Sequence, residues 1–175
     1  IIRARVKTHL ALKLTRDHLE DLVQERTKNL EEAMEALSLT REATLISLAS
    51  LAETRDKETG NHIRRTQNYV RLLAEQLSDH PRFQDVLNEE MIDLLFKSAP
   101  LHDIGKVGVA DYILQKPANL NTFEYEIMKM HAQLGYDALK SAEDMLGSNS
   151  FLHCGAEIAL THHEKWDGSG YPKGL

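Results

Sequence analysis

Seven residues whose side chains bind divalent metals lie in four short stretches of the chain. They are Glu58, His62, His102, Asp103, His131, His162 and His163. Imidazole nitrogens and carboxylate oxygens are common ligands of zinc, iron and manganese. A single His-Asp or His-His pair would be weak support, because such pairs often arise by chance. The whole set is large enough to enclose more than one divalent cation, and it predicts a metal-dependent hydrolase.

The spacing of these residues favours shared metal binding. Glu58 and His62 are four residues apart, so both project from one face if a helix begins near Glu58. His102 and Asp103 are consecutive and would diverge by about 100° on a helix, so that the carboxylate can reach two cations while the imidazole binds one. Cations placed this way lower the pKa of a shared water and polarise a phosphoryl oxygen. We therefore predict that Asp103 is a catalytic residue as well as a metal ligand.

A lysine and a glycine-rich turn lie close to the two adjacent pairs. Lys106 follows Asp103 by about one helical turn and is placed to balance the charge of a phosphate. The turn at residues 168–170 gives the backbone freedom to approach a ligand. For Trp166 and Tyr171, packing within the loop and stacking on a nucleobase are both compatible with the sequence. The side chain of Glu164 is expected to be solvated.

The composition excludes several classes of protein. No apolar segment is long enough to cross a bilayer, so no membrane association is expected. The net charge of -6 argues against binding of polymeric nucleic acid, although a small anionic ligand can still bind to metals and a few local cations. The single cysteine, Cys154, leaves no internal disulfide and fits a reducing compartment. We expect a cytoplasmic protein.

The first 54 residues are predicted to form a long helix. From about Thr8 to Thr54 the sequence contains neither Pro nor Gly and is rich in Leu, Glu, Arg, Lys and Ala. A heptad pattern with polar interruptions runs through this segment. Its d positions are Leu12, Leu19, Arg26, Ala33 and Thr40, and its a positions are Val23, Leu30, Leu37 and Thr44. The pattern indicates either a parallel homodimeric coiled coil that carries a signal or a helix that packs on its own domain.

The rest of the chain also has helical periodicity, without the sustained alternation that is typical of strands. Asn88 is a predicted N-cap, and Asn121 with Glu124 is a predicted capping box. We expect one helix to follow Asn121, and separate helices over residues 135–146 and 151–162.

These segments together predict an all-α protein of two parts. The first part, residues 1–54, is a helical linker or coiled coil. The second part, residues 55–175, is a compact multi-helix core, and it carries all the candidate ligands.

The motifs of the second part resemble those of the HD-GYP family, a branch of the HD superfamily. The resemblance rests on residues 55–62, 101–106 and 162–172 and on His131, and it spans about residues 50–175. It implies an HD-type phosphohydrolase core and a bacterial phosphodiesterase that hydrolyses cyclic di-GMP to linear pGpG or on to GMP. It also implies a centre of two or three divalent metal ions, often iron or manganese.

Residue roles follow from the resemblance, position by position. The implied metal ligands are His62, His102, Asp103, His131, His162 and His163, with Glu58 as the extra ligand of a third metal. Lys106 is implied to contact the phosphate of the substrate and to take part in catalysis with Asp103. Gly170, Tyr171 and Pro172 of the Gly-Tyr-Pro motif are assigned to substrate binding.

The two ends of the chain suggest a larger protein. Residues 2–10 resemble the end of a response-regulator receiver domain and the start of its linker, which implies a role in two-component signalling. In the family a further metal-binding aspartate and several helices follow the Gly-Tyr-Pro motif, whereas this chain stops at Leu175. We therefore expect a C-terminally incomplete domain, and if the remainder is truly absent, the metal affinity and activity of this fragment should be impaired.

Two functions of other classes fit part of the sequence. A degenerate family member could bind the cyclic dinucleotide and signal without cleaving it, although the intact ligand set and Lys106 argue against this. Alternatively, the long helix and the Gly-Tyr-Pro loop could recruit partners such as diguanylate cyclases, while metals only stabilise the fold. A general HD-type nucleotidase is a weaker enzyme alternative, disfavoured by residues 168–172.

Overall fold

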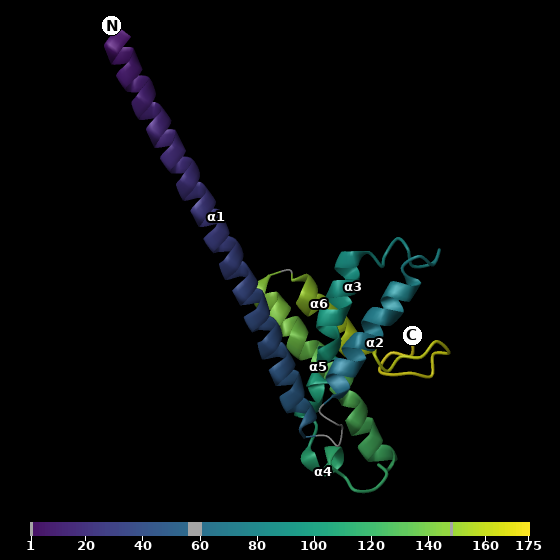
Figure 1. Cartoon of the computed structure of the whole chain (residues 1–175). Coiled ribbons are helices and arrows are strands. Elements are labelled where there is room, and N and C mark those ends of the chain that lie inside the picture. Colours follow the sequence, from purple (N-terminus) through teal and green to yellow (C-terminus); the bar gives the residue numbers. More distant parts are fainter. Residues whose placement is uncertain (1, 56–60, 148) are drawn as a thin grey trace. The chain divides into compact units, whose positions relative to one another are not determined.

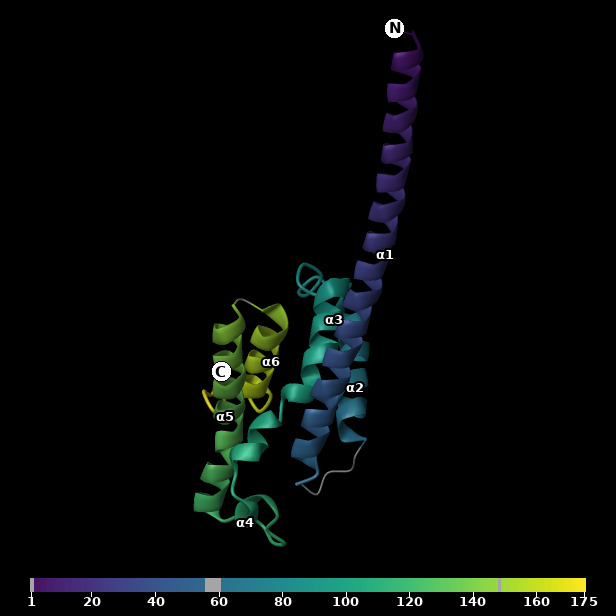
Figure 2. The same cartoon turned by 90° about the vertical axis from the view of Figure 1, so that its left-hand side faces the viewer.

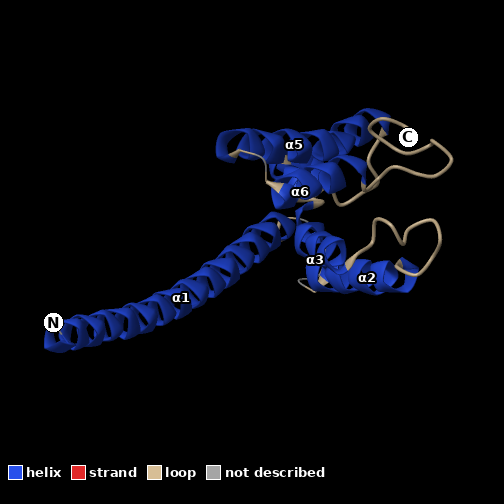
Figure 3. Ribbon diagram, turned by 90° about the horizontal axis from the view of Figure 1, so that it is seen from above, coloured by secondary structure: helices blue, strands red, loops and turns tan. Residues whose placement is uncertain are grey.

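The structure, a computed structural model, describes residues 2–55, 61–147 and 149–175, and within these ranges it consists of helices and loops (Figures 1 and 3). The α-helices are α1 (Ile2–Glu53), α2 (His62–Leu77), α3 (Glu89–Ser98), α4 (Asp111–Leu114), α5 (Thr122–Leu146) and α6 (Ser150–Thr161), and the 3-10 helices are η1 (Ala99–Leu101) and η2 (Ile104–Gly108). No strand occurs in the described ranges, so the prediction of an all-α fold is confirmed. Judged by length and hydropathy, no helix in these ranges qualifies as a membrane span.

Two compact units divide the chain between Ala43 and Thr44. The described residues of the first unit all belong to α1, as expected for a sequence without Pro or Gly. The large apolar side chains of this unit are mostly exposed. The division into domains at residues 1–54 and 55–175 remains a prediction.

The last turns of α1 belong to the second unit and enter its core. Ala49, Ala52 and Glu53 are buried, and Leu45 packs against a cluster of buried apolar side chains. Apolar residues lie on several faces of this segment, and a helix that is apolar all round is stable only inside a protein.

The core of the second unit forms where α5 and α6 lie side by side (Figure 2). Helix α3 packs against both α2 and α6, and η2 packs against α5. The main buried cluster contains Leu101, Leu139, Phe151, Ala156 and Ala159. A smaller cluster around α4 contains Val109, Ile113 and Leu114.

Asparagine side chains cap three of these helices. Asn88 caps α3, and Asn121 with Glu124 forms a capping box at the start of α5, both as predicted. A third cap was not predicted: the side chain of Asn149 accepts hydrogen bonds from two backbone N–H groups at the start of α6. Each cap satisfies N–H groups that have no partner within their own helix.

Helix α5 is a single helix where two were predicted. Gly135 lies in its interior, and a Cβ there would lie 3.2 Å from the Cβ of Ala159 and 3.3 Å from the backbone nitrogen of Gly105. Glycine inside a helix costs about 1 kcal/mol relative to alanine. The close approach of two neighbouring segments offsets this cost, so the glycine does not end the helix.

Candidate metal centre

The predicted metal ligands that the structure describes converge on one region of the second unit. They come from the start of α2, the turn between η1 and η2, the middle of α5 and the chain just after α6. These residues are His62, His102, Asp103, His131, His162 and His163. Glu58, the predicted ligand of a third metal, lies outside the described residues.

A tight contact between two backbones brings Asp103 to α5. His102 and Asp103 lie in a turn between two short 3-10 helices and not on a regular helix. A Cβ on Gly105 would lie 2.0 Å from the carbonyl oxygen of His131 and 2.5 Å from the nitrogen of Gly135. Only glycine allows η2 to approach α5 this closely, and this approach places the carboxylate of Asp103 beside the ring of His131.

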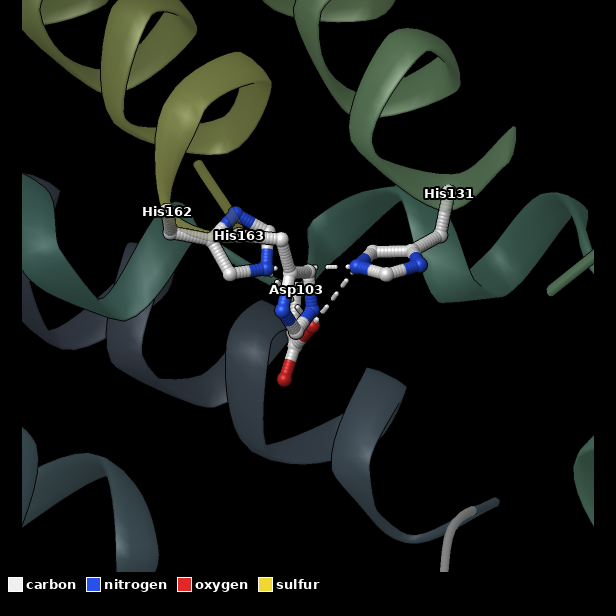
Figure 4. A group of neighbouring side chains, drawn as sticks. All are labelled: Asp103, His131, His162 and His163. Atoms are coloured by element: carbon white, nitrogen blue, oxygen red, sulfur yellow. Dashed lines mark hydrogen bonds and ion pairs between the residues drawn. The ribbon is translucent and has the colours of Figure 1, made fainter. Parts of the chain in front are cut away.

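Four side chains form the first group of candidate ligands, and Figure 4 shows them pointing toward one another. The Nε2 atoms of His131 and His162 are 3.2 Å apart. Oδ1 of Asp103 lies 3.3 Å from Nε2 of His131 and 3.6 Å from Nε2 of His162. The ring of His163 completes the group, with its centroid 4.1 Å from that of His162 and 5.1 Å from that of His131.

A second group shares Asp103 with the first. His62, His102 and Asp103 each offer one ligand atom, and these atoms all lie within 4.8 Å of one another. Oδ2 of Asp103 lies 3.1 Å from Nε2 of His102. The two oxygens of one carboxylate therefore face two different groups of histidines, as expected for a carboxylate that bridges two metals.

Backbone carbonyl groups fix the orientation of three of the imidazole rings. Nδ1 of His102 lies 2.8 Å from the carbonyl oxygen of Ala99, and Nδ1 of His131 lies 2.7 Å from that of Met128. Nδ1 of His162 lies 2.9 Å from the carbonyl oxygen of Ala159. A carbonyl oxygen only accepts, so each Nδ1 donates and each Nε2 faces the cluster. Metal-binding histidines usually have such an outer partner.

The Asp103 carboxylate remains ionised despite its burial. Burial raises its pKa, but polar contacts with His102 and His162 and the nearby charge of Lys106 hold the pKa well below its usual range. The ammonium group of Lys106 lies 2.9 Å from Oδ2 of Asp103 and is itself buried. Burial lowers the pKa of His102, but the hydrogen bond to Asp103 and the negative charge of Asp103 raise this pKa overall.

His131 and His163 are kept neutral, which is the form that binds metals. Burial lowers the pKa of His131, and its other neighbours do not reverse this shift. Burial, with repulsion from His162 and His131, lowers the pKa of His163 to about 4. Both rings therefore carry free nitrogen lone pairs at neutral pH.

This donor set fits divalent cations. Oδ1 of Asp103 is buried and makes no hydrogen bond within the described ranges. Leaving such an atom unsatisfied costs about 1 to 3 kcal/mol or more, and a bound cation would satisfy it. Ligands about 2.1 Å from a cation lie about 3.0 to 3.4 Å apart in octahedral or tetrahedral coordination. The separations of 3.2, 3.3 and 3.6 Å in the first group are close to this range.

The Gly-Tyr-Pro motif lies next to the first group. The ring of Tyr171 is half-buried and stacks on the ring of His163, whereas Pro172 is exposed. A Cβ on Gly170 would lie within 2.6 Å of three backbone atoms of residues 163–165, so the loop requires glycine there. The location of the motif is compatible with substrate binding, which remains a prediction for these three residues.

Glu164 organises this loop, contrary to the expectation that it is merely solvated. Its carboxylate accepts hydrogen bonds from the backbone N–H groups of Lys173, Gly174 and Leu175, at 2.7, 3.2 and 3.0 Å. Burial raises the pKa of Glu164, but these hydrogen bonds lower it overall. The partners lie nine to eleven residues later in the chain, so no local sequence signal indicates this role.

A cavity of about 350 Å³ adjoins the second group. It is lined by His62, His102 and His162 and by apolar side chains that include Val70 and Ile158. The candidate ligands are therefore reachable from a partly apolar space.

Comparison with known proteins identifies the family. Residues 59–174 match the family model of the HD domain. A cyclic di-GMP phosphodiesterase of Vibrio cholerae is 50% identical over 154 residues, which are 88% of this chain and 31% of that protein. A probable cyclic di-GMP phosphodiesterase of the same species is 46% identical over 183 residues, covering 100% of this chain and 40% of that protein. The cyclic di-GMP phosphodiesterase response regulator RpfG of Xanthomonas campestris pv. campestris is 35% identical over 174 residues, covering 99% and 43%.

The chain thus spans less than half the length of each of these relatives. The match to the HD domain nevertheless includes every candidate ligand from His62 to His163. The chain belongs to the HD domain family, in the HD-GYP branch that its motifs resemble.

Proposed function

We propose that the protein that carries this chain is a metal-dependent phosphodiesterase that hydrolyses cyclic di-GMP to pGpG, GMP or both. The names of its relatives support this substrate. The observation that carries the proposal is the placement of Asp103, whose two carboxylate oxygens face separate groups of histidines. Phosphodiester hydrolysis benefits from two adjacent cations, because both the attacking and the leaving oxygen need stabilisation.

The residues of the two groups would hold the metals. One site uses Asp103, His131, His162 and His163, and the other uses His62, His102 and Asp103. Bound cations would supply Lewis acidity toward a phosphoryl oxygen and would acidify a water molecule. We propose iron or manganese, with Glu58 as a ligand of a third metal.

Lys106 is proposed to bind the phosphate. Its ammonium group lies 2.9 Å from the carboxylate that joins the two groups, so it lies at the edge of the space where a phosphate must bind. An ammonium group donates up to three hydrogen bonds, so Lys106 can contact Asp103 and a phosphoryl oxygen together.

Turnover of cyclic di-GMP by the full-length protein tests this function. The protein would be reconstituted with Mn²⁺, or with Fe²⁺ under anaerobic conditions, and its products separated by chromatography. We expect metal-dependent formation of pGpG or GMP. Tight binding of cyclic di-GMP without any hydrolysis would instead support a sensor, and preference for another cyclic dinucleotide would correct the substrate.

A role in recruiting diguanylate cyclase domains is a second proposal. It rests on Trp166, which is 88% exposed in the loop that follows the paired histidines, where a large aromatic side chain is available to a partner. Cyclase binding that survives removal of metals from the protein would support this role. If removal of the metals also abolished cyclase binding, the loop would serve only the metal centre.

A parallel homodimer is proposed from the first unit. The seam residues Leu19, Val23, Leu30 and Leu37 are 54, 64, 61 and 70% exposed. Burying one such side chain stabilises an interface by roughly 1.5 to 3 kcal/mol. Four such side chains per helix outweigh the destabilisation caused by polar Arg26 and Thr40 in the same seam. The dimer would bring together two receiver domains of a response regulator and transmit their state to two phosphodiesterase domains.

We also propose a cytoplasmic location. The single cysteine agrees with a reducing compartment. A receiver domain at the start of the protein would have to meet its kinase inside the cell. The net charge of -6 is unfavourable for binding polymeric nucleic acid.

A further inference from the structure

The backbone orients three of the five candidate histidines, whereas it does not orient the ring of His163. Nδ1 of His102, His131 and His162 each donates to a carbonyl oxygen three residues earlier, at 2.7 to 2.9 Å. Such an outer hydrogen bond fixes the plane of the imidazole and the nitrogen that faces the metal. Within the described ranges the ring of His163 makes no hydrogen bond, although its ligand atom lies close to those of the first group. Another contact must hold its plane.

A stacked aromatic ring provides this contact. The ring centroids of Tyr171 and His163 are 4.5 Å apart, and their planes differ by 23°. The backbones of the two residues are also joined, since the N–H of Tyr171 donates to the carbonyl oxygen of His163 at 3.3 Å. Offset stacking favours near-parallel rings, so the tyrosine ring limits rotation of the imidazole.

The path of the loop brings the tyrosine back over the histidine eight residues earlier. A Cβ on Gly170 would lie 2.6 Å from the carbonyl oxygen of His163 and 2.4 Å from the nitrogen of Lys165, so a larger residue would push Tyr171 away. The carboxylate of Glu164 holds the residues just after the tyrosine. The position of the ring is therefore built into the loop.

Residues of α5 approach the same tyrosine ring. The ring of Tyr125 meets it edge to face, with centroids 6.3 Å apart. Nζ of Lys129 lies 5.7 Å from its centroid and 2.8 Å from a carboxylate oxygen of Glu126. A cation near an aromatic ring is attracted to it. Tyr171 thus contacts both His163 and the helix that carries His131.

We propose that Tyr171 is a positioning residue for His163, and that its aromatic ring, not its hydroxyl group, has this effect. The hydroxyl group makes no hydrogen bond within the described ranges, whereas the ring has four aromatic or cationic neighbours. This inference rests on the proposed function, because it concerns a ligand of the proposed metal centre. It assigns the tyrosine of the Gly-Tyr-Pro motif to metal retention.

Metal titration of three variants tests this role in the full-length, metal-free protein. Tyr171→Phe keeps the ring and removes the hydroxyl group, and Tyr171→Leu removes the ring. Tyr112→Leu makes the same change at an exposed tyrosine of α4 and is the matched control. Calorimetric titration with Mn²⁺ should show about 10- to 100-fold weaker binding at one site for Tyr171→Leu alone, the usual effect of losing an outer partner of a ligand.

Nuclear magnetic resonance provides a readout that does not depend on metal. In protein labelled with ¹³C-histidine, the stacked tyrosine ring shifts the ring resonances of His163, which can be assigned with His163→Gln. We expect Tyr171→Leu to change these resonances in the metal-free protein and Tyr171→Phe to leave them nearly unchanged.

Either of two results would overturn the proposal. Unchanged Mn²⁺ affinity in Tyr171→Leu would show that His163 needs no positioning, and an equal loss in Tyr171→Phe would assign the effect to the hydroxyl group. If even the unmodified protein bound no Mn²⁺, the proposed metal centre would fail separately. The His163 resonances would then test the stacking itself: unchanged resonances in Tyr171→Leu would refute the contact on which the proposal rests.

Discussion

The ligand cluster of the second unit and the heptad seam of the first unit differ in whether their side chains are buried by contacts within the same chain. In the cluster, Asp103 and His131 are 7 and 1% exposed, and their contacts come from other segments of the same chain. In the seam, Leu30 and Leu37 are 61 and 70% exposed. One chain is therefore sufficient to arrange the candidate ligands, whereas the seam needs another surface to become buried.

Metal binding and hydrolysis should therefore depend on different residues from those that determine the oligomeric state. Substitutions in the cluster should change metal binding and hydrolysis without changing the oligomeric state. Substitutions in the seam should change the oligomeric state while each metal centre keeps its ligands. The following experiments test this separation.

The largest effect is expected in the seam. Changing Leu30 and Leu37 together to Lys removes four apolar side chains from a dimer, a loss on the order of 6 kcal/mol or more. The dimer dissociation constant should rise by more than about 10⁴-fold. Sedimentation or light scattering of the full-length protein measures this change.

Leu14 and Leu39 provide the matched control, because they are exposed but lie outside the a and d positions. Changing both to Lys should leave the dimer intact. A protein that is already monomeric at micromolar concentration, or seam variants that stay dimeric, would refute the coiled coil.

The next largest effect is expected at the shared carboxylate. Asp103→Ala removes a ligand from both groups, so hydrolysis of cyclic di-GMP should fall at least about 100-fold, with loss of metal. Elemental analysis and turnover measure the two losses. Asp137→Ala, an exposed change on α5, is the control. Near-normal turnover by Asp103→Ala would refute the assigned centre, and a change in oligomeric state would contradict the separation.

Removal of metal should lower stability by a smaller amount. A ligand present at 100 times its dissociation constant stabilises the folded state by about 2.7 kcal/mol. Chelation should therefore lower the Tm of the second unit by roughly 5 to 10 °C. Calorimetry before and after dialysis against a chelator measures this shift. The dimer should survive the treatment, and an unchanged Tm after proven metal loss would contradict the prediction.

The smallest effect is expected at Lys106. Lys106→Ala should raise KM for cyclic di-GMP about tenfold, because a charge-assisted hydrogen bond to phosphate is lost. Metal content should remain the same. Lys165→Ala, an exposed lysine of the loop, is the control. Loss of metal from Lys106→Ala would instead indicate that this lysine maintains the ligand geometry of Asp103.

The parts of the fold that depend on local interactions could be predicted from the sequence. The capping residues Asn88 and Asn121 interact with residues three positions later, so their motifs carry most of the necessary information. Gly135 shows the limit of this approach. The low helix propensity of glycine is a local property, whereas the close approach of Gly135 to Gly105 is a tertiary contact. The tertiary contact determines the outcome, and the helix continues through Gly135.

The same distinction applies to the candidate site. The candidate ligands that the structure brings together could be chosen from residue types, because few side chains bind metals and these are grouped in the sequence. The turn at Asp103, the stacking of Tyr171 on His163 and the hydrogen bonds of Glu164 could not be predicted. Each depends on a path of the backbone that residue spacing alone does not specify.

The sharing of Asp103 between the two groups has a thermodynamic consequence. Whatever factor the first cation contributes to the affinity of the second, the second must contribute to the affinity of the first. Occupancies of the two sites are therefore linked in both directions. If both sites bind cations, as proposed, exchange of the ion in one site would change how strongly the other retains its own, and at equilibrium the metal content of each site would depend on which metal occupies the other.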